Sequence, residues 1–551
     1  MPTLAGESPG EWYFDETAFV VRVRHPQEAL ANAIAFLHSV SPMYSEYLLS
    51  DESDYRELTA HPALDAIDLD QGIFWGGYFD EQGTAVYYAV LHTRDGEALL
   101  TALGVEKQGL GVLRRDSEIV IASSPEVIDH LKKLRDGGGR SCVSLMSAEQ
   151  RATFDTSDVA VFFNTKQVYT RIRRDVQTDE DARQELLNLL EPLVEWYDED
   201  FAGRVLRLET VLTGINAVID SSSVVVGGSI DKSGLAVEVV LEHDADKQTT
   251  KRPEYPLSNF QALRRMPPDR QCYALGTAPF PVPAGWFLEV VELDDLRDDE
   301  DAPKLSAQGE LVRRIGKLNF GPWAAAVSFP TAISGEFRLD AVAQIEKPQA
   351  YRLMNNNLAV VQSQFKAFRE KRAYELLAGS EQYGAAAADV HRVTYKTTDD
   401  KKEDYEAKLH GPDGLISRCL YDDNLFVNTV GGGQGAMEQA LLRLRSQELP
   451  ELPAELAATR LQLPTEGNFM LLVDTASILK SLMRLEANAG DDRGVFGEIA
   501  RRGILLADRP KTYVGLAIVS TPARARAKFY LPSSHAASLV RTWVLGAGDL
   551  F

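Results

Sequence analysis

The stretch from Leu425 to Leu441 has the spacing most suggestive of cofactor chemistry. It reads LFVNTVGGGQGAMEQAL, an apolar run followed by Gly431, Gly433 and Ala436 in the pattern G-x-G-x-x-A and then by a helical pattern. Glycines at this spacing permit a tight turn and a close approach of a phosphate to a helix N-terminus. A dinucleotide site also needs an acidic residue about 20 residues further on, where this chain has a Pro-containing linker. We interpret Gly431–Gly435 as a flexible connection, and an enzyme site for a phosphate-bearing cofactor is the alternative.

Two other groups of residues could hold a metal ion. The acidic run Glu292–Asp301 offers carboxylates to Ca²⁺, but it lacks the spaced D-x-D-x-D-G pattern of a calcium loop, so a solvated loop is favoured. His92 and His243 occupy matching positions in an internal repeat described below. Matching positions favour a shared structural role over metal binding or catalysis.

The three cysteines and the remaining motifs give no catalytic signal. Cys142, Cys272 and Cys419 form neither a CxxC pair nor a zinc-type spacing, so three ordinary thiols are expected, with one disulfide as the alternative. The chain contains no HExxH, GxSxG or P-loop motif. We therefore predict no catalytic, cofactor-binding or metal-binding residue and no cofactor, and we lean against enzyme activity.

An internal repeat organises the elements that would position any site. Val224–Asp246 has two apolar runs around the polar turn Asp231–Gly234, which is a β-hairpin signal. Ile73–Asp95 has the same pattern 151 positions earlier. Without a gap, eight positions agree: Gly76/Gly227, Gly77/Gly228, Asp80/Asp231, Gly83/Gly234, Ala85/Ala236, Val86/Val237, His92/His243 and Asp95/Asp246. This agreement predicts two related hairpins.

The first hairpin is rich in aromatic residues. Trp75, Tyr78, Tyr87 and Tyr88 lie within it. Strand alternation puts Tyr87 and Tyr88 on opposite faces, so one set is expected to face solvent. Core packing is the favoured role of these rings, and an apolar ligand groove or a partner surface is the alternative.

The order of elements predicts an α+β fold. Strand-to-helix corners at 20–30, 161–169 and 471–479 are alike, since each strand runs into a cap residue or a Pro-started first turn. The segments 112–131 and 418–441 also resemble each other. We predict two similar lobes from an internal duplication, each an antiparallel sheet with helices packed on one face. A subdivision of each lobe into two half-units is consistent with the hairpin repeat.

The predicted domain limits follow from the length and from one break in the chain. A chain of 551 residues exceeds a single ordinary core. Pro267-Pro268 cannot continue a helix and marks the boundary. Long helices are expected at about Asp181–Leu212 and at Gln349–Leu377. The limits are a leader at 1–14, a first lobe at 15–267, a second lobe at 268–545 and a tail at 546–551.

Composition and charge narrow the classes of partner. The net charge is −23, and the chain is 44% hydrophobic and 25% charged, as in soluble globular proteins. An acidic surface repels phosphate backbones, so nucleic acid is not an expected partner. No apolar run reaches the roughly 18–20 residues that span a bilayer, and no signal-peptide pattern is visible. We expect a cytoplasmic protein, or a periplasmic or otherwise extracytoplasmic one if Met1 replaces a removed signal peptide.

Three segments carry a family resemblance. The strand within DETAFVVRVRHPQEAL, the strand-turn-strand GVLRRDSEIVIASSPEVIDHL and the later FFNTKQVYTRI resemble bacterial envelope proteins of unknown function. Those are duplicated α+β chains that are exported or lipid-anchored. The resemblance follows most of the chain in its order of elements and includes no diagnostic motif. It implies an envelope location and a duplicated fold, but no activity and no site residues, and the missing export signal departs from it.

Three functions are consistent with these features. The leading hypothesis is a non-catalytic binding or interaction scaffold of the bacterial envelope, with an unknown protein or an apolar ligand as its partner. The second is a carrier of an apolar ligand such as a lipid, and the third is an enzyme with a phosphate-bearing cofactor at Gly431–Gly435. A scaffold is expected to gather surface aromatics on one sheet face. It is also expected to lack a pocket in which polar groups and titratable residues converge.

Overall fold

The computed structural model divides the chain into two compact units. The first comprises Met1–Trp196, Leu208–Glu254 and Ser520–Ala537, and the second comprises Tyr197–Arg207, Tyr255–Val519 and Ser538–Phe551. The structure describes residues 12–50, 61–80, 82–168, 221–243, 255–277, 302–315, 318, 320–330, 336–396, 409–411, 413–489 and 511–547. The helix predicted at 181–212 and the acidic run at 292–301 lie outside the described residues. The lobe limit at residue 267 stays a prediction.

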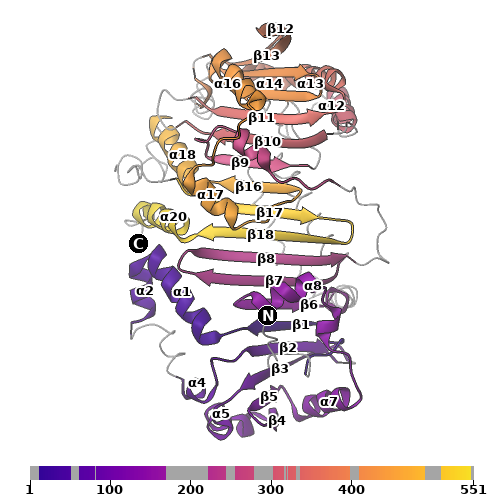
Figure 1. Cartoon of the computed structure of the whole chain (residues 1–551), viewed down its shortest axis with the longest axis vertical. Helices are drawn as coiled ribbons and strands as arrows, with labels where there is room; N and C mark the ends of the chain where they lie inside the picture. Colours follow the sequence, from indigo (N-terminus) through magenta and orange to yellow (C-terminus); the bar gives the residue numbers. More distant parts are fainter. Residues whose placement is uncertain are drawn as a thin grey trace. The chain divides into compact units, whose positions relative to one another are not determined.

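The first unit is built on one antiparallel sheet (Figure 1). Its strands lie in the order β4, β5, β3, β2, β1, β6, β7, β8 and β18, and each neighbouring pair is antiparallel. Their bounds are β1 (Phe19–Val23), β2 (Ile73–Phe79), β3 (Ala85–His92), β4 (Gly111–Arg115), β5 (Glu118–Ala122), β6 (Val159–Phe163), β7 (Ser221–Asp231), β8 (Gly234–His243) and β18 (Arg524–Pro532).

The second unit also has an antiparallel sheet. Its order is β12, β13, β14, β15, β11, β10, β9, β16 and β17. The bounds are β9 (Cys272–Gly276), β10 (Phe320–Ser328), β11 (Arg338–Ile345), β12 (Arg372–Tyr383), β13 (Ala386–Tyr395), β14 (Leu415–Asp422), β15 (Leu425–Val430), β16 (Phe469–Val473) and β17 (Val514–Ser520). Helices and antiparallel sheets together confirm the predicted α+β class.

The helices start where the sequence supplies start signals. Pro occupies the first turn of several, and the Asp95 side chain accepts from the Glu97 and Ala98 amides at the start of one. In the first unit they are α1 (Pro26–Val40), α2 (Pro42–Leu48), α4 (Pro62–Ala66), α5 (Gly96–Ala102), α6 (Val105–Gln108), α7 (Pro125–Asp136), the 3-10 helix η2 (Cys142–Leu145) and α8 (Ala148–Thr156). The others are η4 (Gln261–Arg265), α12 (Ala302–Ile315), α13 (Pro348–Ser363), α14 (Lys366–Lys371), α16 (Gly433–Arg445), α17 (Ala454–Leu461), α18 (Thr475–Ala489) and α20 (Ser533–Ala547).

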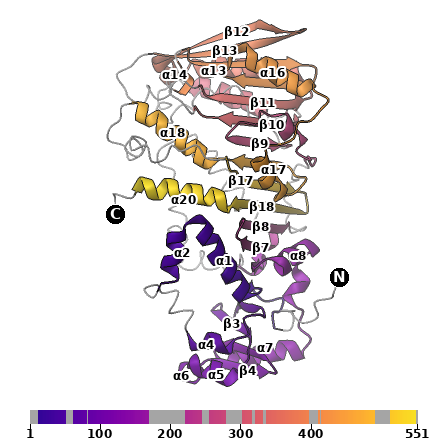
Figure 2. The same cartoon turned by 60° about the vertical axis from the view of Figure 1, so that its left-hand side comes forward.

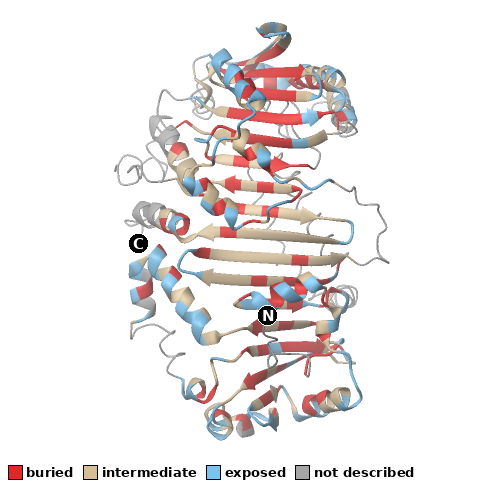
Figure 3. Ribbon diagram, viewed as in Figure 1, coloured by how far each residue is buried: buried red, intermediate tan, exposed pale blue. Residues whose placement is uncertain are grey.

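Helices cover both faces of the first unit's sheet. Val90 of β3 packs with Ile128 and Leu131 of α7, whereas its neighbour Leu91 packs with Leu99 of α5. Adjacent strand residues point to opposite faces. α1 and α8 both contact β7, and Figure 2 shows them on opposite sides of it. Figure 3 shows buried residues along the strands between these helices.

The second unit follows the same rule. Cys419 of β14 packs in one cluster with Tyr351 and Leu358 of α13, whereas the adjacent Arg418 and Gln434 of α16 both bond Glu381. The prediction that helices pack on one face only is therefore wrong. Its physical reason is that many of these strands are apolar on both faces, so each face needs a covering layer.

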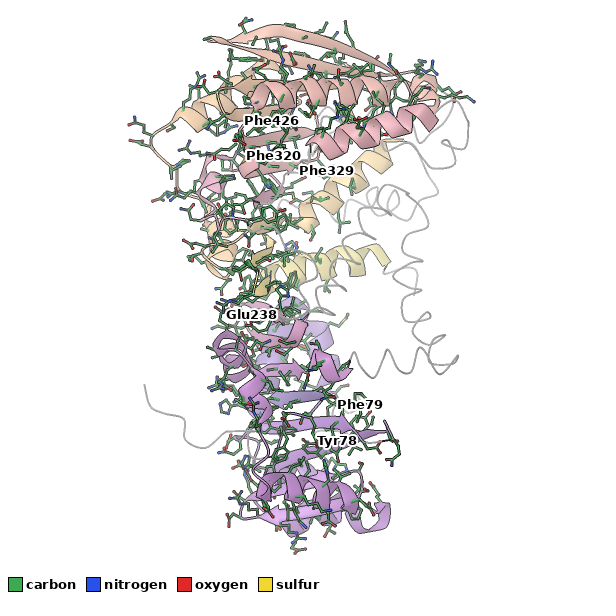
Figure 4. The ribbon with its side chains drawn as sticks, turned by 90° about the vertical axis from the view of Figure 1, so that its right-hand side faces the viewer. Tyr78, Phe79, Glu238, Phe320, Phe329 and Phe426 are labelled. Atoms are coloured by element: carbon green, nitrogen blue, oxygen red, sulfur yellow. The ribbon has the colours of Figure 1, made fainter. Side chains whose placement is uncertain are left out.

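Aromatic contacts fix α13 against the second sheet. Phe320 of β10 and Phe426 of β15 each meet the ring of Tyr351 edge-on, with centroids 5.4 and 5.1 Å apart. Figure 4 labels Phe320 and Phe426. Edge-on pairs of this kind are favoured by the quadrupoles of the rings. Tyr351 is fully buried, so this contact lies inside the core.

The two predicted hairpins are present as β2–β3 and β7–β8. Their shared glycines permit close packing against the same side of the sheet. A Cβ on Gly76 would lie 2.7 Å from the Tyr13 ring, and one on Gly227 would overlap the hydroxyl of Ser157, which follows α8. The shared aspartates bond the turns, since Asp80 accepts from the Thr84 amide and Asp231 from the Ser233 amide, each at 2.7 Å.

The two turns differ by one residue. Gly77 pairs with Tyr87, whereas Gly228 pairs with Val237. The sequence repeat, aligned without a gap, predicts that Tyr87 corresponds to Glu238 and not to Val237. A shift of one residue exchanges the two faces of a strand, so the repeat is structurally equivalent in its first strand and offset in its second.

The long helix predicted at Gln349–Leu377 is wrong in its second half. α13 ends at Ser363, α14 follows, and the chain then enters β12, which pairs with β13. The letters RAYELL at 372–377 suit a helix locally, but pairing with β13 decides, because strand formation depends on context. Gly379, with φ of +62°, forms an irregularity in this ladder.

The hairpin glycines give a stability prediction. Gly76→Ala should lower the free energy of unfolding by roughly 1–3 kcal/mol, because its Cβ would overlap the Phe19 carbonyl at 2.6 Å and the Tyr13 ring. Gly228→Ala is the matched control. Its nearest neighbour would be the Val159 carbonyl at 3.8 Å, so it should be neutral or slightly stabilising. Urea unfolding measures both, and equal destabilisation would refute the assignment.

Candidate functional site

The predicted glycine loop lies in the second unit, between β15 and α16, in the wall of a pocket. The pocket has a volume of about 240 Å³. Its walls combine loop backbone with charged and aromatic side chains. The described residues that line it are Glu336, Phe337, His410, Asp413, Gly414, Leu415, Ile416, Arg418, Val430, Gly431, Gly432 and Gly433.

The loop geometry explains its glycines. Gly431, Gly432 and Gly433 have φ of +71°, +71° and +62°, a region that side chains rarely adopt. At Gly431 and Gly432 the chain itself fills the space that a side chain would need, whereas the space at Gly433 is open. A Cβ on Gly431 would overlap the Phe337 carbonyl, and one on Gly432 would overlap the Arg338 guanidinium. The three glycines are therefore accounted for by backbone conformation and packing.

An internal carboxylate engages the amide that a phosphate would use. The Gly432 N–H donates a 2.8 Å hydrogen bond to Glu336 Oε2, and Arg338 lies 3.5 Å from the same oxygen. A phosphate at this amide would meet a negative charge. β15 is also antiparallel to both neighbours, whereas a dinucleotide loop follows a parallel strand. The geometry argues against the phosphate-bearing cofactor at Gly431–Gly435.

His410 forms the aromatic wall of the pocket. Its ring stacks on Tyr395 with centroids 6.0 Å apart and meets Phe337 edge-on at 5.6 Å. Burial, assisted by the positive charge of Arg372, lowers the pKa of His410 to about 4. The imidazole is therefore neutral at pH 7.

Arg418 is neutralised by a neighbour. Its Nε donates to Glu381 Oε2 at 2.8 Å. Burial alone would raise the pKa of Glu381, but hydrogen bonds from Arg418 and Tyr383 hold it below its ordinary value. Glu381 is thus a carboxylate at neutral pH and balances the guanidinium.

The pocket contradicts one expectation of the scaffold hypothesis. Glu336, His410, Asp413 and Arg418 converge on it, so a pocket with polar and titratable groups is present. None of its described lining residues is a Ser, Thr, Cys or Lys. Its residues of nucleophilic type are therefore the carboxylates of Glu336 and Asp413 and the imidazole of His410, and Glu336 already accepts from the Gly432 amide.

A second polar cluster, which the sequence did not reveal, is buried between α13 and the sheet. His391 Nδ1 lies 2.8 Å from the Tyr374 hydroxyl, and its Nε2 has no hydrogen-bond partner in the described part of the chain. Asn428 Nδ2 lies 2.8 Å from Ser417 Oγ and 3.3 Å from Cys419 Sγ. Burial raises the pKa of Cys419 to about 12 and lowers that of His391 to about 4. Both are uncharged at pH 7, so they do not form an activated thiolate pair.

A buried carboxylate ties α13 to the same sheet. Asp389 accepts from Arg352 Nε at 2.7 Å, from Asn356 Nδ2 at 2.8 Å and from the Gly379 amide at 2.8 Å. Burial opposes ionisation, but these donors hold the pKa of Asp389 below its ordinary value. The Asp389 carboxylate thus has its hydrogen-bond donors within the fold. No short motif could have identified this cluster, because its residues come from separate strands and a helix.

The aromatic residues of the first hairpin divide as predicted. Trp75 and Tyr87 are 46% and 43% exposed, whereas Tyr78 and Tyr88 are 8% and 2% exposed. Phe163 of β6, 38% exposed, lies on the same face as Trp75, since both belong to the set opposite the core. We call Phe19, Trp75, Tyr87 and Phe163 the aromatic surface. The predicted orientation of Tyr87 and Tyr88 on opposite faces is confirmed.

Three rings of the aromatic surface, those of Phe19, Trp75 and Tyr87, contact one another. Trp75 meets Phe19 edge-on at 5.2 Å and stacks on Tyr87 at 5.9 Å. Gly77 makes this possible, because it pairs with Phe19 on one side and with Tyr87 on the other. A Cβ on Gly77 would lie 3.2 and 3.3 Å from the Tyr87 and Phe19 rings. These three rings thus form one contiguous apolar cluster.

The same face is apolar beyond the aromatic surface. One row of successive cross-strand partners crosses six strands, and at about 4.8 Å per strand it is roughly 24 Å wide. None of its members is charged. The row is Trp75, Val21, Val161, Val226, Val239 and Ala527.

The remaining predicted positions have structural surroundings. His92 Nε2 lies 4.0 Å from Glu118 Oε1, and His243 pairs with Ser221 in the ladder. The one-residue turn difference means that His92 and His243 are not at equivalent positions, which corrects the sequence comparison. No group of three or more His, Cys, Asp and Glu suited to a metal occurs among the described residues. The three cysteines are free thiols, as predicted.

Family models, curated proteins and solved structures give no match to this chain. Where the structure describes helices, none is both long and apolar enough to cross a bilayer. The resemblance to bacterial envelope proteins stays a prediction.

The buried histidine predicts a pH dependence. Because the folded pKa of His391 is about 4 against 6.5 when unfolded, its contribution to stability is complete above pH 6.5 and is lost as the pH falls toward 4. The loss is about 1.4 kcal/mol per pKa unit. His391→Gln should make urea-unfolding stability fall less steeply between pH 6.5 and 4, with a remaining slope from His410, whose pKa is also lowered to about 4. His38→Gln, at an exposed position of α1, should keep the wild-type profile. Identical profiles for all three proteins would refute this.

Proposed function

We propose that this chain is a non-catalytic binding scaffold and that it binds through the aromatic surface of its first unit. The observation that carries the proposal is the contact cluster of Phe19, Trp75 and Tyr87, with Trp75 and Tyr87 exposed by 46% and 43%. Single exposed apolar residues are common, but a contiguous aromatic cluster on a sheet face is typical of an interaction site.

The energy available at this surface is sufficient for binding. An aromatic side chain buries about 150–250 Å², so covering Trp75 and Tyr87 would remove roughly 150–200 Å² from water. At about 25 cal/mol per Å² this contributes about 4–5 kcal/mol before the costs of association. Because the rings already contact one another, little side-chain entropy is lost on binding.

The non-catalytic part of the proposal is supported by the second unit. The pocket at the glycine loop offers no Ser, Thr, Cys or Lys among its described lining residues, and Glu336 already accepts from Gly432. The thiol of Cys419 and the imidazole of His391 are buried and neutral. These groups stabilise the fold and need no substrate to explain them.

We also propose that the two units arose by duplication, so that each is a copy of one ancestral α+β module. The support is the succession of strand partners. β1 pairs with β2 and β6, as β9 pairs with β10 and β16. β3 pairs with β2 and β5, as β11 pairs with β10 and β15. β12 and β13 are then an addition beside β14, for which the described part of the first unit has no counterpart.

The half-units within the first module have a matching register. Phe19 pairs with Gly77 and Val23 with Ile73 in β1–β2. In β6–β7, Val159 pairs with Gly228 and Phe163 with Val224. Each ladder has five residues and ends on the corresponding positions of the hairpin repeat. Duplication within a module explains this agreement with one event.

The envelope location is part of the proposal and rests on the sequence resemblance. An envelope scaffold would meet partner proteins or lipids outside the cytoplasm. Fractionation of the native host, with detection of this chain by antibody, tests the location independently of binding.

Loss of apolar probe binding tests the aromatic surface. Trp75→Ser combined with Tyr87→Ser should reduce binding of a fluorescent apolar dye by about half or more, because these two rings are the most exposed members of an aromatic cluster on the described surface. The stability of the variant should change by less than about 1 kcal/mol, since both rings are half exposed.

A matched control removes two exposed apolar side chains that lie outside the aromatic surface. Leu353→Ser with Leu461→Ser alters residues that are 64% and 82% exposed on α13 and α17. It should leave dye binding unchanged. If the aromatic variant binds as much dye as the wild type, the proposed surface is not the binding site.

A carrier of an apolar ligand is the second candidate, and the uncharged row from Trp75 to Ala527 favours it. A carrier should retain its ligand during detergent-free purification. Native mass spectrometry should then show a mass excess that disappears after organic extraction, and that is reduced by Val161→Asn. A mass equal to that of the bare chain would exclude a retained ligand and favour the scaffold.

A further inference from the structure

The second unit contains positions that correspond to the aromatic surface. Val21 pairs with Trp75 at the centre of the β1–β2 ladder, and Ala274 pairs with Ala325 at the centre of β9–β10. Ala325 therefore corresponds to Trp75. Gly77 and Val327 each lie two residues further along the same strands. Gly77 pairs with Tyr87 and Val327 pairs with Leu339, so Leu339 corresponds to Tyr87.

In the second unit, helices cover these positions. Ala325 is 6% exposed and lies in one cluster with Tyr351 and Leu358 of α13. Leu339 is 4% exposed and lies in one cluster with Ala359 of α13 and with Phe365, the residue before α14. The corresponding Trp75 and Tyr87 are nearly half exposed. These positions of the face are thus covered in one copy and nearly half exposed in the other, where α1 and α5 cover the face at β7 and at Leu91 instead.

The length of one helix explains the difference. α13 follows β11 and has 16 residues, whereas α5 follows β3 and has 7. Leu99 of α5 packs on Leu91 and Ile119, which lie at the outer part of the face, and the helix ends at Ala102. At 1.5 Å per residue, α5 is about 13 Å shorter than α13, so it covers less of the face.

We infer that the aromatic surface binds an amphipathic α-helix of a partner protein, which takes the place that α13 takes in the second unit. The inference rests on the proposed function and names its partner class. The bound segment needs about three turns and an apolar stripe at i, i+3, i+4 and i+7. The buried residues of α13 show that spacing at Asn355, Leu358, Ala359 and Gln362, of which the first and last are amides.

Charge defines the other face of the partner helix. The chain has a net charge of −23. Its summed field attracts cations and repels anions, and this affects association most at low salt. A helix with lysine or arginine on its solvent side therefore fits better than an acidic one.

Three model peptides of about 16 residues test the inference on the full chain. The first places Leu on one helical face and Lys on the other, the second has the same composition in scrambled order, and the third replaces Lys by Glu. Binding is measured by anisotropy of labelled peptide, and helix formation by circular dichroism. The amphipathic basic peptide should bind as a helix at least 10-fold more tightly than either of the others.

The binding site is tested with variants. Trp75→Ser with Tyr87→Ser should weaken the basic helical peptide by 10-fold or more, whereas Leu353→Ser with Leu461→Ser should not. Equal binding to the wild type and to the aromatic variant would overturn the inference, because the peptide would then bind elsewhere on the acidic surface. Equal binding of the helical and scrambled peptides would also overturn it.

Two further arms separate the inference from the proposed function. Phosphatidylcholine vesicles test a lipid surface, and analytical ultracentrifugation tests a second copy of the chain as the occupant. Vesicle binding or self-association could depend on Trp75 and Tyr87 while binding of the helical peptide does not. That result would overturn the inference of a partner helix and would leave the aromatic surface as the binding site. If no probe, including the apolar dye, distinguishes the aromatic variant from the wild type, both fall.

Discussion

The antiparallel ladder between the two short central strands is the constraint on which each unit depends. In the first unit, β1 and β6 pair over five residues around Val21 and Val161. This register puts Val20 and Phe162 into the core and leaves Phe19 and Phe163 on the other face. Each hairpin then extends the sheet from one side of the pair. A slip by one residue would exchange both faces, so the core and the aromatic surface are fixed by one ladder.

A sheet that is apolar on both faces must be covered on both, and the length of the covering helices then decides what stays open. α7 and α8 cover the face of Val90, and α5 covers part of the face of Leu91. In the second unit the longer α13 extends this cover. Trp75 and Tyr87 are therefore exposed because the helix that follows β3 is short. A shorter helix after β3 leaves apolar surface in water, and burying that surface against a partner is favourable.

The candidate site was predictable where its chemistry is local. Alternation along Tyr87-Tyr88 was enough to place one ring in the core and the other outside, and the sequence repeat located both hairpins correctly. The glycine loop was found, but its role was not predictable. Glu336, which occupies its amide, lies 96 residues away, and this contact has no local signal. The buried cluster of His391 and Cys419 was missed for the same reason.

The sequence by itself determined the strands, the turns and the sidedness of the first hairpin, because these depend on neighbours within a few residues. Only the tertiary structure decided that Arg372–Tyr383 is a strand, since its partner β13 outweighs a helical composition. It also decided that a one-residue difference in turn length separates His92 from His243 in the ladder. The same holds for the cover of the sheet. Which apolar residues are buried depends on where a helix ends in space, and that is set by long-range packing rather than by the local pattern.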